Sequence, residues 1–158
     1  MNYKLENYFL QPGYLYASQE QLIISTVLGS CVSVCLWDKV NRFGGMNHFI
    51  YPRRGKEGIS TKFGDVACPY LFRMMADCGS RFENLAIHVV GGSQNPTLNS
   101  SIGKDNADIV HQYLKKLGLV PASVDVGGQY GRKVAFNTAT GEVIVYKCEQ
   151  LRESDWHR

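Results

Sequence analysis

The sequence predicts a mixed α/β domain. Short apolar runs rich in β-branched residues, which are typical of strands, occur along most of the chain. Two other segments repeat their apolar residues at helical spacing. The chain has 158 residues, which is enough for one domain with a sizeable core. We therefore expect a single domain over residues 1–158, with a polar C-terminal tail from about residue 149.

The first half of the chain is predicted to hold three strands. Residues 21–28 and 31–37 are apolar and β-branched, and residues 38–41 form a polar turn after them. Residues 44–51 are expected to be the strand that returns from this turn. Residues 52–60 are rich in glycine and basic side chains, which is typical of a loop.

Two amphipathic helices are predicted, one on each side of a further strand at residues 84–92. The first helix is marked by Ala67, Leu71, Met74, Met75 and Cys78. Pro69 fits this helix if it lies in the first turn, where the N–H groups have no intrahelical partner. The second helix is marked by Ala107, Val110, Leu114 and Leu117, and Gly118 suits its C-terminal cap. Residues 119–128 are expected to be extended, and residues 132–148 to form a hairpin about Thr138–Gly141.

Composition excludes several classes of function. The 17 basic and 14 acidic residues give a net charge of +3, which is too mild for a nucleic-acid-binding face. Arg53-Arg54-Gly55-Lys56 is a short basic cluster, either a solvated loop or a docking patch for an acidic partner. No apolar run approaches the ~20 residues of a membrane span, and the first residues do not resemble a signal peptide. We expect a cytoplasmic protein without membrane insertion.

Five cysteines are present: Cys31, Cys35, Cys68, Cys78 and Cys148. In the cytoplasm they should stay reduced. The odd number and the absence of a Cys-x-x-Cys pair argue against a disulfide framework or a zinc site, so no metal is expected.

Cys31 is the candidate nucleophile. It follows Gly29-Ser30 between two predicted strands, where small side chains let the backbone turn sharply. Pairing about the turn at residues 38–41 would bring Cys31 and His48 to the same edge of a sheet, which is the nucleophile–base arrangement of acyl transfer. The backbone N–H groups near Gly29 and Ser30 would then face an oxyanion.

A structural interpretation stands beside each of these. A cysteine in an apolar run is usually a small buried hydrophobe, and the other four cysteines are expected in the core. His88 and His111 fit a satisfied strand residue and a polar helix face. The glycine pairs Gly91-Gly92 and Gly127-Gly128 match no full nucleotide-binding pattern and fit tight loops.

Several segments resemble the CheD family of bacterial chemoreceptor glutamine deamidases. "LGSCVSVCLWD" followed by "GGMNHFIYP" is similar to the family's opening motifs, and "TKFGDVA" and "VVGGSQ" follow in order. "IGKDNADIVHQYLKKLGL" resembles its second helix and "VDVGGQYGRKVAFNTATGEVIVYK" its closing segment. The resemblance covers nearly all of residues 22–147, and the first two motifs together are specific.

The resemblance assigns roles to individual residues. It implies Cys31 as the nucleophile and His48 as the base. The family's third residue is a threonine shortly before the cysteine. Alignment on Cys31 puts Ser25 there, with Thr26 one residue later; we favour Ser25 by register and keep Thr26 open, since neighbouring strand residues point to opposite faces. Val126 stands where the family has threonine, which leaves a polar role at that position in doubt.

The resemblance also implies a fold and an activity. The fold would have β-sheet layers with helices packed outside, resembling the cysteine-hydrolase fold of deamidating toxins. The activity would convert receptor glutamine side chains to glutamate and ammonia through a cysteine thioester, without metal or organic cofactor. The partners would be methyl-accepting chemotaxis receptors and, in some relatives, a CheC-type phosphatase. The alternatives are a non-catalytic adaptor that binds receptors or a CheC-type protein, and a cysteine hydrolase acting on another protein amide.

Overall fold

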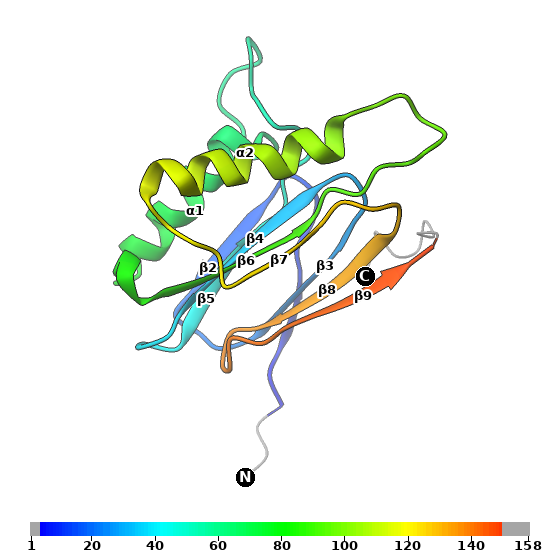
Figure 1. Ribbon diagram of the computed structural model, residues 1–158. Helices are drawn as coiled ribbons and strands as arrows, with labels where there is room; N and C mark the ends of the chain where they lie inside the picture. Colours follow the sequence, from blue (N-terminus) through cyan, green and yellow to red (C-terminus); the bar gives the residue numbers. More distant parts are fainter. Residues whose placement is uncertain (1–3, 150–158) are drawn as a thin grey trace.

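The fold has three layers, seen in a computed structural model that describes residues 4–149. Helices α1 and α2 cover one face of a five-stranded sheet, and a four-stranded sheet lies against its other face (Figure 1). The elements are β1 (Asn7–Phe9), β2 (Leu15–Ser18), β3 (Ile23–Leu28), β4 (Val32–Asp38), β5 (Phe43–Asn47), α1 (Gly64–Asp77), the 3-10 helix η1 (Phe82–Asn84), β6 (Leu85–Gly91), α2 (Ile102–Leu117), β7 (Ser123–Val126), β8 (Gly131–Asn137) and β9 (Val143–Cys148). The mixed α/β class predicted from the sequence is confirmed.

The two sheets have the strand orders β2-β5-β4-β6-β7 and β1-β3-β8-β9. Consecutive strands β3 and β4 therefore belong to different sheets, and the chain crosses between layers at the turn that carries Cys31. The β4–β5 and β8–β9 hairpins were predicted and are antiparallel. Strands β1 and β2 were not predicted, because each is only three or four residues long. The predicted tail lies, from residue 150 on, outside the described residues.

Each sheet interface has its own apolar core. One lies between the helices and the five-stranded sheet, and the other lies between the two sheets. Strand β4 contributes to both: Val34 and Leu36 face the helices, and Cys35 faces the four-stranded sheet. Burial on both faces explains why β4 is mostly apolar, with Ser33 and Asp38 as its buried polar residues. Cys35 and Cys68 are fully buried, as expected of core residues, whereas Cys78 and Cys148 are half-buried.

One predicted strand end is wrong in position, and the condition stated for Pro69 is not met. Strand β5 ends at Asn47 and not at Tyr51, because the Asn47 side chain takes the N–H of Val34 at 2.7 Å and so interrupts the ladder. One isolated bridge, Val32 with Phe49, continues the same pairing beyond this point. Pro69 lies in the second turn of α1, since that helix begins at Gly64, whose N–H donates to the Tyr51 carbonyl at 2.7 Å.

The N-terminal part of α2 lies against the end of β6. A Cβ atom at Gly103 would collide with the carbonyl of Ser93, so the helix backbone approaches the chain as closely as only glycine allows. At the other end of α2, Gly118 forms the predicted left-handed C-cap, with φ 71°. Close packing at Gly103 places the first turns of α2 beside the turn that precedes β4.

The close contact of α2 at Gly103 can be tested through its effect on stability. Glycine to alanine in a helix normally stabilises by up to about 1 kcal/mol. Here Gly103→Ala should lower the free energy of unfolding by about 2 kcal/mol, because the added methyl meets rigid backbone. Urea unfolding followed by circular dichroism measures the change. The control is Lys116→Ala on the exposed face of the same helix, which should be nearly neutral. A Gly103→Ala variant as stable as the control would refute this account of the helix contact.

Candidate functional site

The turn that carries Cys31 is fixed by its carbonyl groups. The N–H of Ser93 donates to the Gly29 carbonyl at 3.0 Å, and the N–H of Gly92 donates to the Cys31 carbonyl at 2.9 Å. Gly91 has φ 118°, and a Cβ atom there would strike the Cys31 carbonyl, so the position requires glycine. The glycine pair at the end of β6 therefore supports the cysteine turn. This contact gives Gly91-Gly92 a structural role at the site.

His48 lies just beyond the end of β5 and is fully buried. Its backbone is held on both sides: its N–H donates to the Tyr14 carbonyl at 3.0 Å, and its carbonyl accepts from Gly13 N–H at 2.7 Å. The ring Nδ1 lies 2.7 Å from the Thr26 hydroxyl oxygen. These contacts fix both the position and the plane of the imidazole.

Hydrogen-bond accounting settles the tautomer of His48. The Thr26 hydroxyl oxygen is also 2.7 Å from the Leu10 carbonyl, and the single hydroxyl proton must lie between those two oxygens. Thr26 therefore accepts from His48, so that Nδ1 carries the proton. The Nε2 atom is left with a free lone pair, and this buried atom has no partner among the described residues. A neutral imidazole with a free Nε2 is the form that a general base requires.

The preference for Ser25 as the partner of His48 is corrected by this geometry. The Ser25 hydroxyl donates to the Asn7 side-chain carbonyl oxygen at 3.0 Å, on the opposite side of β3 from Thr26. Counting residues back from Cys31 gives the wrong partner, because the hydrogen bond to His48 depends on which face of β3 points between the sheets. In β3 that face carries the buried Thr26, which the sequence kept open.

Strand register relates Cys31 to His48. The pairs Cys35–Met46 and Val32–Phe49 share one antiparallel register, which sets Ser33 opposite His48. Cys31 lies two residues before Ser33 on the same face and packs against the core between the sheets. Diagonal neighbours of this kind have Cβ atoms about 7 Å apart. Since His48 Nε2 has no partner among the described residues, thiol and imidazole are near neighbours without a direct hydrogen bond.

Burial keeps both groups neutral in the free protein. It raises the pKa of the Cys31 thiol to about 11, partly offset by the N–H of Cys31 itself, which lowers that pKa. It lowers the pKa of His48 to about 4. Burial thus favours the neutral thiol and neutral imidazole over a thiolate–imidazolium pair in the free protein. Proton transfer between the two groups must accompany attack on a substrate.

A cleft of about 730 Å³ opens beside this turn. Its lining residues are Gly29, Ser30, Ser93, Gln94, Asn95, Pro96, Leu98, Ser100, Ile102, Gly103, Gln129, Tyr130, Gly131 and Glu149. The segment after β7 is held in place by buried Arg132, which donates to the Gly127 carbonyl at 2.8 Å and pairs with Asp125 at 3.2 Å. The N–H of Gln94 donates to the Gly128 carbonyl at 2.8 Å and joins the two walls.

Sequence reasoning missed Asn106 and Arg132. Asn106 is fully buried on α2, and its amide donates to the carbonyls of Ser30 and Ile50, each at 2.9 Å. The signal was present, because Gly103, Asn106 and Val110 share the buried face of an amphipathic helix. A polar residue on such a face must find partners. Arg132 offered no comparable signal, since its partners come from the turn after another strand.

Two structural features are absent from residues 4–149. In that range no three His, Cys, Asp or Glu side chains gather where they would hold a metal ion. Neither of the two helices has the length and apolar character that crossing a membrane demands.

The sequence of this chain is similar to one described protein family and to several named relatives. Residues 51–147 match the model of a family described as CheD, chemotactic sensory transduction. A protein of Trichlorobacter lovleyi named "probable chemoreceptor glutamine deamidase CheD" is 38% identical over 153 residues, covering 94% of this chain and 95% of the relative. A protein of Rhodospirillum rubrum with the same name is 39% identical over 140 residues, covering 87% and 80%.

The buried imidazole predicts a pH dependence of stability. Unfolded His48 takes up a proton below its ordinary pKa of 6.5, whereas folded His48 does so only near pH 4. The unfolded state therefore binds more protons in this window, and stability falls as pH drops from 6.5 to 4, by about 3 kcal/mol in all. Urea unfolding of wild type and His48→Gln is measured from pH 7.5 to 4.5. The difference between their free energies of unfolding should shrink as the pH falls, because only wild type loses this contribution. Parallel curves would contradict a neutral buried imidazole.

Proposed function

The chain belongs to the CheD family, and we propose that it deamidates glutamine side chains of methyl-accepting chemotaxis receptors, giving glutamate and ammonia. Relatives at 38% and 39% identity that span most of the chain carry this activity in their names. The observation that carries the proposal is the buried His48, which is held through Nδ1 and leaves Nε2 free beside the Cys31 turn.

Acylation begins with the Cys31 sulfur attacking the carboxamide carbon. Because the thiol is neutral, its proton passes to His48 Nε2 as the carbon–sulfur bond forms. The carbonyl oxygen becomes an oxyanion, which the backbone N–H of Cys31 stabilises with that of Ser30. Protonated His48 then gives its proton to the departing amine. Ammonia leaves, and the glutamyl group remains on Cys31 as a thioester.

Deacylation reverses the roles. His48 Nε2 removes a proton from water, the resulting hydroxide attacks the thioester, and the oxyanion forms at the same N–H groups. Its collapse releases glutamate and returns the proton to the Cys31 sulfur. The Thr26 hydroxyl accepts from Nδ1 throughout and so holds the ring in one orientation. These steps use the chain's own side chains and water, with no metal or organic cofactor.

The cleft beside Gly29 and Ser30 is the proposed approach for the receptor segment. Its walls carry side chains that can meet a polar peptide, including Gln94, Gln129 and the half-exposed Tyr130. The proposal also includes a single deamidase domain over residues 1–158, acting in the cytoplasm. Two facing sheets with the cysteine at the crossing between them support a likeness to the deamidating-toxin fold.

Replacement of the nucleophile separates catalysis from docking. Cys31→Ser keeps the shape and removes the acidic thiol, so ammonia release from a receptor fragment should fall at least about 1,000-fold. Binding of the fragment should change less than about threefold, since recognition is spread over many contacts. Ammonia release and binding are measured side by side. If wild type binds the fragment yet releases no more ammonia than Cys31→Ser, the enzyme hypothesis is wrong. The protein would then be an adaptor that binds receptors or a CheC-type phosphatase.

The third residue is tested by a matched pair on neighbouring positions. Thr26→Val leaves the Nδ1 proton of His48 buried without an acceptor, a loss of about 1–3 kcal/mol, so kcat should fall about 10- to 100-fold. Ser25→Ala removes a partly exposed bond to Asn7 and should change kcat less than about threefold. Circular dichroism checks that both variants are folded. A larger loss in Ser25→Ala would show that Thr26 does not orient the base.

A further inference from the structure

Asn106 joins the two halves of the proposed site. One amide hydrogen goes to the carbonyl of Ser30, directly before the nucleophile, and the other goes to the carbonyl of Ile50, two residues after the base, each at 2.9 Å. Asparagine is a poor helix former, and this one is fully buried in the second turn of α2. Its place on the helix therefore follows from the two hydrogen bonds and not from helix propensity.

The bond to Ser30 sets the direction of the neighbouring N–H. The Ser30 carbonyl and the Cys31 N–H belong to one planar peptide and point in opposite directions. When Asn106 holds the carbonyl toward α2, the N–H of Cys31 points away from the helix. Ser93 and Gly92 hold the preceding and following carbonyls in the same way. The Asn106 amide therefore fixes the middle one of three successive peptides.

The position of the Cys31 side chain agrees with this direction. It packs against the core between the two sheets, on the face of the five-stranded sheet away from α2. Donor and sulfur therefore lie on the same side of the turn, where an oxyanion formed by attack of this sulfur develops. Orientation of this peptide is what an oxyanion donor needs.

The bond to Ile50 acts on the other side of the site. Strand β5 ends at Asn47, so regular sheet pairing does not carry the chain from His48 to Tyr51. The Ile50 N–H donates to the Lys62 carbonyl at 2.8 Å, and the Ile50 carbonyl is taken by Asn106. Displacement of this carbonyl would move the segment that follows the base relative to the nucleophile turn.

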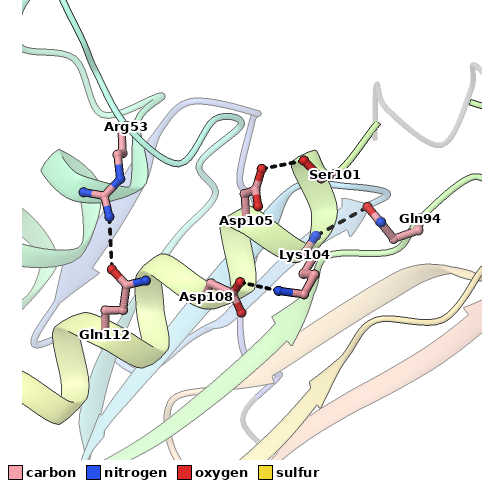
Figure 2. Close-up of polar contacts among 7 residues, drawn as sticks. All are labelled: Arg53, Gln94, Ser101, Lys104, Asp105, Asp108 and Gln112. Carbon is pink, nitrogen blue, oxygen red and sulfur yellow. Dashed lines mark hydrogen bonds and ion pairs between the residues drawn. The ribbon is translucent and has the colours of Figure 1, made fainter. Parts of the chain in front are cut away.

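The outer face of α2 contacts the same two flanks. Arg53 donates to Gln112 at 3.0 Å, and the N–H of Lys104 donates to Gln94 at 3.4 Å (Figure 2). Lys104 also pairs with Asp108 at 2.8 Å along the helix. These contacts are exposed and contribute little each. The buried Asn106 amide is thus the stronger link between α2 and the site.

We propose that Asn106 is a positioning residue for deamidation, which orients the Cys31 N–H toward the oxyanion and ties the nucleophile turn to the segment after His48. The inference rests on the proposed function. A structural role alone would also satisfy two carbonyls, and it would lower stability without a selective effect on the chemical step. The Asn106 Oδ1 atom is buried with no partner among the described residues, so residue 106 serves through its two donors.

The test compares Asn106→Leu, which has a similar volume and no donor, with Thr138→Val. Thr138 is a buried side chain that bridges the N–H and carbonyl of Leu22, in another part of the fold. Three quantities are measured for each: kcat and KM for ammonia release from a receptor fragment, the rate of Cys31 alkylation by iodoacetamide, and the urea unfolding midpoint. Alkylation needs no oxyanion donor, and burial has the largest effect on the pKa of the Cys31 thiol, so the alkylation rate should depend only weakly on the direction of the Cys31 N–H.

Asn106→Leu should lower kcat about 100-fold, the usual effect of losing one oxyanion donor. KM and the alkylation rate should stay within about threefold, and Thr138→Val should keep kcat within about twofold. Turnover of Asn106→Leu within threefold of wild type would overturn the proposal, as would equal losses of kcat and alkylation. If leucine prevents folding, Asn106→Ser is the second variant, and its kcat should be at least tenfold below that of wild type. If neither variant folds, Asn106 has a structural role and the proposal is overturned. Wild type without ammonia release would refute the deamidase itself.

Discussion

The site depends on three successive backbone carbonyl groups, each of which accepts a hydrogen bond from a residue outside the turn. Gly29, Ser30 and Cys31 give their carbonyls to Ser93, Asn106 and Gly92, so the turn between the two sheets cannot rotate its peptides. Fixing the carbonyls fixes the N–H groups on the opposite side of the same peptides. The glycines at the end of β6 belong to this arrangement, because a side chain at Gly91 would meet the Cys31 carbonyl. Backbone, and not a charged side chain, thereby prepares the site for negative charge.

A neutral resting pair follows from where this turn lies. Cys31 packs against the core between the sheets, and His48 is buried in the same interior, so burial disfavours the charged form of each. Thr26, a hydroxyl, cannot stabilise an imidazolium as a carboxylate would. Charge therefore develops in the proposed reaction only when substrate brings the carbonyl that becomes the oxyanion. A neutral thiol reacts more slowly with electrophiles and oxidants than a thiolate does, so this state limits alkylation and oxidation between turnovers.

The sequence predicts the local pieces and misses what the layers bring together. Hairpins β4–β5 and β8–β9 and the cap at Gly118 depend on neighbouring residues, and all three were predicted. For the hydroxyl that bonds His48 the sequence favoured Ser25 and kept Thr26 open, because counting along β3 says nothing about which face meets the other sheet. Asn106 is 76 residues from Ser30, so their contact required the packing of α2. The Cys31 and His48 assignments came from the expected hairpin pairing and then from motif resemblance, and their catalytic roles remain predictions.

Buried polar atoms without hydrogen-bond partners lower the stability of the fold near the proposed site. Among the described residues, four buried side-chain atoms lack a hydrogen-bond partner: Ser33 Oγ, His48 Nε2, Asn106 Oδ1 and Arg132 Nε. Each such atom costs about 1–3 kcal/mol when it stays without a partner. All four belong to residues of the site or its supports: the base, the residue opposite it, the amide behind the nucleophile turn and the guanidinium under the cleft wall. At His48 and Asn106, stability is lost where the proposed chemistry needs a free or preoriented polar group.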